Sequence, residues 1–178
     1  MSVGRLYAML RDGTGAAAAE MALVAPLLLI IMMGSVELGN YFLSEHVLLK
    51  GVRDGARFAG RRGFANYAGC SGSSAAVPTT LSDDTKLIVR KGTLNSNDPD
   101  LLPNWASATF AVSMSCATAA GGTTLGGIYT GNVTGTAGMA PAVTVTASVP
   151  YRPVLASFGF TGVGFALNAS EQAAVMGV

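Results

Sequence analysis

Residues 16–36 read AAAAEMALVAPLLLIIMMGSV, an apolar run that contains one charged residue, Glu20. A helix rises ~1.5 Å per residue, so a run of this length matches the ~30 Å hydrocarbon core of a bilayer. The run therefore predicts a transmembrane helix. Pro26 lies inside it, and we expect this proline to kink the helix, which membrane helices tolerate better than soluble ones.

A cleaved secretory signal is the alternative interpretation of this run, because Arg5 and Arg11 precede it. The apolar core of such a signal is usually ~7–15 residues long and is followed by an Ala-x-Ala-type cleavage site. The run is longer than that, and no such site follows it. We therefore expect the helix to be retained.

The helical pattern continues beyond Val36 with an amphipathic character. Apolar residues recur at steps of three and four, as expected for one face of a helix: Leu38, Tyr41, Phe42, Leu48, Leu49, Val52, Ala56 and Ala59. Arginines follow in the last turns, and Gly63 is the expected C-cap. The outer half of this helix needs another element to cover its apolar face.

The remainder of the chain predicts a small antiparallel sheet. Apolar and polar residues alternate over 109–115, 143–149 and 163–172, which indicates strands with one apolar face. The segment around 82–91 is either a short helix capped by Ser82 and closed by Gly92 or a strand. The Gly- and Thr-rich residues 121–138 predict a long loop. The predicted fold class is therefore α+β, with the sheet covering the outer half of the long helix.

Composition limits the possible functions. Charged residues make up 12% of the chain, hydrophobic residues 50%, and the net charge is +1, so no basic field favours nucleic acid. One histidine leaves most hydrolase and metal chemistries without their parts, and we expect neither an enzyme nor a bound cofactor. Oxygen ligands between Asn95 and Asp100 could suit Ca²⁺, but their spacing matches no EF-hand loop, and a solvated turn is the favoured interpretation.

Three residues outside the apolar pattern are candidates for function. A carboxylate such as Glu20 in an apolar span costs several kcal/mol unless it is paired, so it is functional by default. The alternative is a glutamate close enough to the edge of the span to reach headgroup water. Cys70 and Cys116 are an even pair in a part that looks exported, which favours a disulfide over two free thiols.

The stretch 11–62 resembles the TadE-like family, minor pseudopilins of the tight-adherence (Tad) type IV pilus machinery. The resemblance depends on the Gly–Ala run before Glu20, on Pro26, on Val36–Gly39 (VELG) and on Arg53–Ala59 (RDGARFA). Residues 143–153 also look like the family's C-terminal strand. A resemblance of this kind implies a type IV pilin-like fold.

The resemblance further implies processing by a prepilin peptidase between Gly15 and Ala16, which places Glu20 at the fifth position of the mature chain. The free amine of Ala16, in the same or a neighbouring subunit, would then be the partner of Glu20. It divides the chain into a leader (1–15), a transmembrane half-helix (16–37), an amphipathic half-helix (38–63) and an extracytoplasmic α+β domain (64–178).

The resemblance implies a subunit of the bacterial inner membrane with a cytoplasmic N-terminus, which takes part in assembling a pilus for surface adhesion. Its partners would be other pilin subunits, the prepilin peptidase, the pilus assembly platform and membrane lipid. By the positive-inside rule alone, the arginines and lysine after the span favour the opposite orientation. A signal-anchored periplasmic binding module and, more remotely, an envelope enzyme with an unrecognised site are the alternative functions.

Overall fold

The computed structural model describes residues 14–67, 75–118, 127–129, 139–159 and 164–177. Helix α2, Thr14–Gly60, runs without interruption through Pro26 and confirms the predicted long helix. It ends at Gly60, and not near Gly63 as the sequence predicted. The chain divides into two compact units, Met1–Asn40 and Tyr41–Val178, and each is described by itself.

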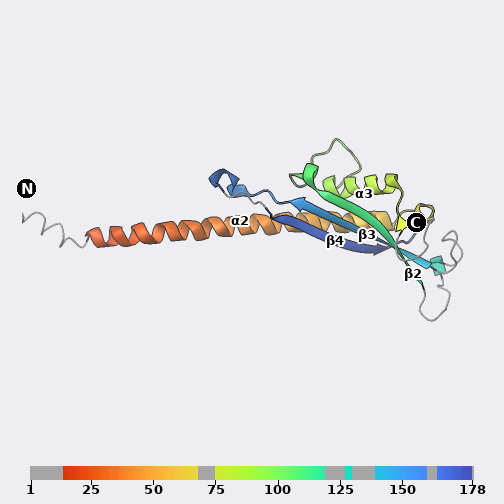
Figure 1. Ribbon diagram of the computed structural model, residues 1–178, viewed down its shortest axis with the longest axis horizontal. Coiled ribbons are helices and arrows are strands. Elements are labelled where there is room, and N and C mark those ends of the chain that lie inside the picture. The colour runs from red at the N-terminus through yellow and green to blue at the C-terminus, as the bar shows by residue number, and fades with distance from the viewer. Residues whose placement is uncertain (1–13, 68–74, 119–126, 130–138, 160–163, 178) are drawn as a thin grey trace, which may run out of the picture. The chain divides into compact units, whose positions relative to one another are not determined.

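The second unit is built from the end of α2, one further α-helix and a four-stranded antiparallel sheet (Figure 1). The strands lie in the order β1-β2-β3-β4, so neighbours in the chain are neighbours in the sheet. Their bounds are Ala75–Ala76 for β1, Thr109–Thr118 for β2, Met139–Pro150 for β3 and Ala166–Ala174 for β4. This arrangement confirms the predicted α+β class.

All three predicted strands are present, with different ends. Strand β3 begins at Met139, four residues before the alternating pattern, because Cys116, Ala117 and Thr118 extend β2 opposite it. Strand β4 begins at Ala166, whereas the pattern began at Val163, which lies outside the described residues. Buried and half-buried residues alternate along β3, as a sheet with one covered face requires.

Helix α3, Thr79–Lys91, settles the ambiguous segment as a helix. It begins three residues before Ser82, with Pro78 at its N-cap position and no capping side chain, so the prediction of a Ser82 cap was wrong. The predicted end is confirmed: Gly92 adopts a left-handed conformation at φ 76° and donates its N–H to the Ile88 carbonyl at 2.8 Å.

The core of this unit lies between α2 and the inner face of the sheet. Helix α2 contributes Leu48, Val52, Ala56 and Ala59, all at most 1% exposed. They pack in one cluster with residues of β2, β3 and β4 that include Met114, Val143, Val145, Val149 and Leu167. The sheet therefore covers the apolar face of the outer half of α2, as the sequence predicted.

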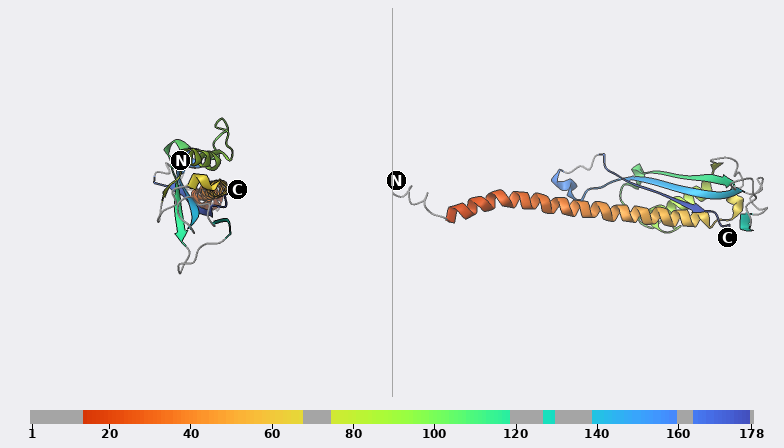
Figure 2. Two further views of the ribbon diagram at one scale, coloured as in Figure 1. Left: turned by 90° about the vertical axis from the view of Figure 1, so that its right-hand side faces the viewer. Right: turned by 90° about the horizontal axis from the view of Figure 1, so that it is seen from below.

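Helix α3 packs on a different side of α2, and the two helices approach closely (Figure 2). A Cβ atom built on Gly51 would lie 2.6 Å from the Val89 carbonyl oxygen, and one built on Gly55 would lie 2.5 Å from a Val89 methyl carbon. A side chain at position 51 would push against the backbone of α3, and one at position 55 would force the Val89 side chain to move, so both glycines favour the close approach of the two helices. The Gly51-x-x-x-Gly55 spacing is the sequence signal for this contact, and the apolar period of α2 does not reveal it.

The C-terminal end of α2 is closed by two hydrogen bonds from distant parts of the unit. Met176 donates its N–H to the Gly60 carbonyl at 2.8 Å, and Tyr67 donates its hydroxyl to the Ala59 carbonyl at 2.5 Å. The last carbonyls of a helix have no partner inside it, and the Ala59 carbonyl also accepts from the Arg62 N–H at 3.0 Å in the turn that follows. Burial of Tyr67 raises the pKa of its hydroxyl to about 12, which keeps it a donor.

The turn after α3 is held by charge. Arg90 donates to both carboxylate oxygens of Asp100, at 2.5 and 2.7 Å, and Lys91 lies 3.3 Å from the same carboxylate. The hydrogen bond from Arg90 holds the pKa of Asp100 below its ordinary value. The Asp100 carboxylate therefore ties the far end of the loop after α3 back to the last turn of α3.

We expect Asp100→Asn to lower the free energy of unfolding by about 1–2 kcal/mol at neutral pH, because Arg90 and Lys91 lose a charged acceptor that is partly open to solvent. A lowered pKa contributes stability above the unfolded value of about 3.9, and that stability is lost as the pH falls through the folded value. The difference between the two chains should thus shrink below about pH 4. Urea titrations in detergent at several pH values measure it; Asp83→Asn, an exposed position on α3, is the control. A constant difference across this range would contradict the prediction.

Candidate assembly helix

The first half of α2 exposes its apolar side chains all round. Between Met21 and Val36 every large apolar residue that is described, except the half-buried Met33, lies on the surface, up to 79% exposed at Leu23. Within the described part of the chain, α2 is the one helix long and apolar enough to cross a membrane. A surface of this kind is stable only in lipid or against other apolar helices. It fits a single-pass membrane anchor.

The predicted processing residues lie in the first turn of this helix. Gly15 and Ala16 are both exposed, and a Cβ atom built on Gly15 would meet no other atom within 4 Å. Packing within the chain therefore gives no reason for glycine at this position, in contrast to Gly51 and Gly55.

Glu20 lies one turn after Ala16, on the exposed surface of α2. Residues four apart lie on the same face of a helix, so the carboxylate and the backbone nitrogen of Ala16 are on one side. Among the described residues no cation forms an ion pair with Glu20. A carboxylate in this setting is available to a group from outside the chain, or to a new N-terminus at Ala16.

The hydroxyl of Ser35 in this half is satisfied locally. Ser35 donates its hydroxyl to the Ile31 carbonyl at 2.8 Å, four residues earlier in the helix. Such back-bonding hides the hydroxyl of a serine within an apolar helix. Pro26 has no N–H, so the carbonyl of Ala22 lacks its usual helical donor. Glu20 thus carries the one formal charge between Gly15 and Val36.

The structure describes one of the two cysteines. Cys116 lies in β2, half-buried beside the core and opposite Pro141 of β3. Cys70 lies outside the described residues, so its pairing with Cys116 stays a prediction.

We expect Cys70 and Cys116 to be joined in the native protein. The bond would close a loop of about 46 residues and would stabilise the folded domain by roughly 4 kcal/mol on the chain-entropy model. Mass mapping of the protein without reduction measures this directly, with a reduced sample as the control. Two thiols that alkylate without reduction would rule the disulfide out.

The loop that offered oxygen ligands for Ca²⁺ uses them internally. Asp98 accepts from the hydroxyl of Thr93 at 2.5 Å and from the amide of Asn95 at 2.8 Å, while Asp100 is held by Arg90. Among the described residues no group of three potential metal ligands occurs. The loop is therefore a turn whose polar side chains hydrogen-bond to one another.

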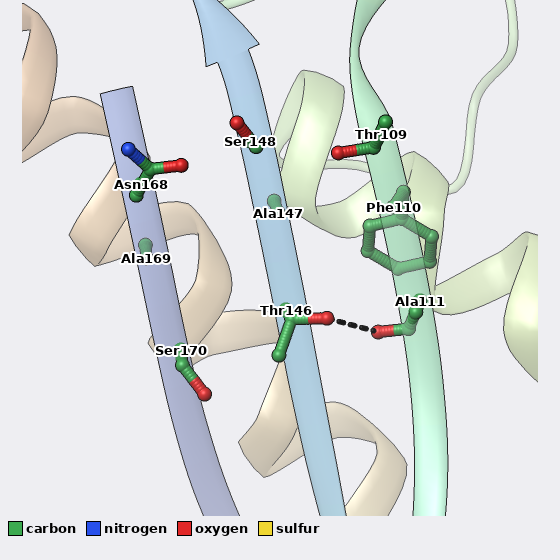
Figure 3. Close-up of a pocket in the computed structure, with 9 residues that line it drawn as sticks. All are labelled: Thr109, Phe110, Ala111, Thr146, Ala147, Ser148, Asn168, Ala169 and Ser170. Carbon is green, nitrogen blue, oxygen red and sulfur yellow. Dashed lines mark hydrogen bonds between the residues drawn. The ribbon is translucent and has the colours of Figure 1, made fainter. Parts of the chain in front are cut away.

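The outer face of the sheet carries an open hollow of about 430 Å³ (Figure 3). Small side chains, most of them polar, lie in rows across the three strands, with Thr109, Ser148 and Asn168 in one row and Ala111, Thr146 and Ser170 in the next. No charged residue lines it, and its one aromatic lining residue is Phe110.

Helix α2 carries the exposed apolar half, Gly15 in its first turn and the packed second half. It is also the part of the chain that matches a known protein family. Residues 15–57 match the TadE-like protein family. The match confirms the resemblance over this stretch and covers α2 from its second residue to three residues before its end. TadE-like proteins are associated with Tad pilus systems, and this family is in general non-enzymatic. Among curated proteins and among solved structures, nothing matches the chain.

Proposed function

We propose that this chain is a minor pilin, or pseudopilin, that takes part in assembling a Tad-type pilus for surface adhesion. The observation that carries the proposal is the coincidence of the TadE-like match with α2, whose first half is an exposed apolar surface and whose second half is core. Its role is structural and not catalytic. Its partners are other pilin subunits, the prepilin peptidase and the assembly platform of the membrane.

The mechanism is exchange of lipid for protein around the first half of α2. In the membrane, lipid covers the apolar side chains between Met21 and Val36. In an assembling bundle, the same side chains of neighbouring subunits cover one another, while the sheet faces outward. This exchange needs little rearrangement within the second unit, because the second half of α2 is already covered by the sheet and α3.

The peptidase acts between Gly15 and Ala16 in this proposal. The resemblance to the TadE-like family supports this site, and Gly15 lies in the exposed first turn of α2, where another molecule can reach it. The amine released at Ala16 is largely protonated at neutral pH and pairs with Glu20, in its own chain or in a neighbour. Pairing matters because a desolvated carboxylate is costly alone and tolerable beside a cation.

The divisions of the chain follow from this processing. Residues 1–15 are the leader, 16–37 the transmembrane half, 38–63 the amphipathic half and 64–178 the extracytoplasmic domain. The N-terminus is cytoplasmic, residues 16–37 lie in the inner membrane, and everything after Gly63 lies outside the cytoplasm. A periplasm-dependent reporter fused after Gly92 should be active; an active cytoplasmic reporter at that site would show the opposite orientation.

N-terminal sequencing of the protein from membranes and from sheared pili of the native host tests the function. We expect Ala16 as the first residue in both fractions, and Met1 in a host without the peptidase. Protein in the membrane alone, in a host that makes pili, would place it at the base of the fibre. An intact leader in a host with active peptidase would contradict the proposal.

A further inference from the structure

The face of α2 that points away from the sheet carries positive charge in the second unit. Lys50, Arg57 and Arg61 are exposed, and their spacing of seven and four residues places them on one side of the helix. Val52 and Ala56 point into the core on the opposite side. Within the described part of the chain, none of the three cations forms an ion pair. We call Lys50, Arg57 and Arg61 the basic face.

The arginines at the two borders of the basic face are paired with carboxylates of the chain itself. Arg62 lies 3.1 Å from the carboxylate of Asp84 in α3, and Arg53 lies 3.9 Å from that of Glu171 in β4. The Arg62 guanidinium also lies 4.3 Å from the centre of the Phe58 ring. A carboxylate is therefore the anion that the fold already places against both borders.

An open hollow of about 430 Å³ lies on the basic face. Arg57 and Arg61, one helical turn apart, line it together with Asp54, Phe58 and Arg62. Arginine and aromatic side chains are enriched at the energetic centres of protein–protein interfaces. A guanidinium group can also donate two parallel N–H groups to one carboxylate. The hollow thus suits an acidic side chain of another protein.

The charge of this surface is small. The basic face carries three positive charges and Asp54, in the hollow, carries one negative charge, a net of +2. Nucleic acid is typically held through about 6–10 phosphate contacts, and Asp54 would repel those phosphates. A protein segment with a few carboxylates matches this charge better than a polyanion does.

A second copy of this chain does not offer such a segment in its second unit. Four of the seven carboxylates there are engaged within their own chain: Asp84, Asp98, Asp100 and Glu171. Of the other three, Glu45 and Asp54 are half-buried on α2, and Asp83 alone is exposed. One carboxylate cannot match three cations, so the complementary segment belongs to a different protein.

We propose that the basic face of α2 docks an acidic segment of a different protein, whose carboxylates enter the hollow between Arg57 and Arg61. The evidence lies within the second unit alone. The inference therefore requires neither the leader cleavage nor the pilus of the proposed function, and it adds the chemistry by which a partner is recognised.

The test is cross-linking with a carbodiimide, which joins an amine directly to a carboxylate, in membranes of the native host. Lys50 supplies one amine, and Arg57→Lys supplies a second while keeping the positive charge. Lys86, an exposed lysine on α3, is the matched control. Mass spectrometry of the linked peptides identifies the residue on each side of the bond.

We expect Lys50 and position 57 to link to aspartate or glutamate of one other protein, and Lys86 to form no such link. With that protein purified, the double variant Arg57→Glu, Arg61→Glu should bind it at least about tenfold more weakly, because like charges then face each other. Lys86→Glu should bind as the parent does. Changing the linked carboxylate to lysine should restore binding to the double variant.

Three results would overturn the proposal. The first is the lack of carboxylate links at Lys50 and position 57, or equal links at Lys86. The second is links to Asp83 of this chain alone, which would assign the basic face to a second copy. The third is binding to phosphatidylglycerol vesicles that the double variant loses, without links to protein, which would assign it to lipid headgroups. Unfolding of the double variant in denaturant, which should match the parent, checks that its fold is intact.

Discussion

A chain carrying Glu20→Ala should enter the membrane at least as well as the parent and yet be missing from pili. Removing a carboxylate from an apolar span removes a cost of about 2.5–3.5 kcal/mol on insertion scales, so insertion gains. Assembly loses, because the N-terminal amine of a processed subunit no longer meets a buried carboxylate and is left unpaired. Quantifying the protein in washed membranes and in sheared pili measures the two effects separately.

Two further substitutions separate charge from shape at this position. Glu20→Gln keeps the size of the side chain and removes its charge, so it should fail as Glu20→Ala does. Glu20→Asp keeps the charge and should retain part of the assembly. Pili made at normal levels with Glu20→Ala would show that Glu20 is a tolerated carboxylate at the edge of the span. Gly15→Leu should block processing and assembly together, while Gly34→Ala, also in open space, should affect neither.

The double variant Gly51→Ala, Gly55→Ala should lose about 2–4 kcal/mol of unfolding free energy, a large part of what holds a domain of this size together. Alanine is ordinarily the better helix former, by about 1 kcal/mol at each position. Here the added methyl groups would overlap the Val89 carbonyl oxygen and a Val89 methyl group, so α3 must move away from α2. Denaturant unfolding in detergent, followed by the emission of the buried Trp105, measures the loss.

Gly39→Ala is the matched control for that variant. It makes the same change in the same helix, but an added Cβ at Gly39 would meet nothing within 4 Å. We expect it to be neutral or slightly stabilising. Equal losses in the control and the double variant would show that glycine content, and not the contact with α3, determines the effect.

The parts of the fold with a strong hydrophobic period were predictable from sequence. The run before Val36 and the recurrence of Leu48, Val52 and Ala56 specify the helix and its buried face, since burial decides both. Strand β3 was equally clear, because its valines alternate with threonine and serine. Its N-terminal extension was not, since Ala140 and Pro141 carry no period of their own and pair because β2 lies opposite them.

Capping and close packing could not be predicted in the same way. The Gly63 and Ser82 predictions relied on local residue preference, but α2 is ended at Gly60 by Met176 and Tyr67, and α3 begins at Pro78. The end of α2 depends in part on Met176, which lies far from Gly60 in the chain. The need for Gly51 and Gly55 likewise appears only once Val89 is placed against them.

The candidate site was predictable in position more than in role. Apolar pattern and charge are enough to single out Glu20, and the resemblance adds Gly15 and Ala16. What each residue does depends on molecules outside the chain, which sequence reasoning reaches only by analogy.

The direction of the strands relative to α2 has a mechanical consequence. Strands β2, β3 and β4 run along the second half of α2 and not across it (Figures 1 and 2). A force that pulls on the helix at Tyr41 would therefore load the contacts of Leu48, Val52, Ala56 and Ala59 in shear, all at once, and not peel them one by one. When α2 is pulled along its axis, these contacts must break together, so the domain resists unfolding more strongly in this direction than in one that peels the helix from the sheet.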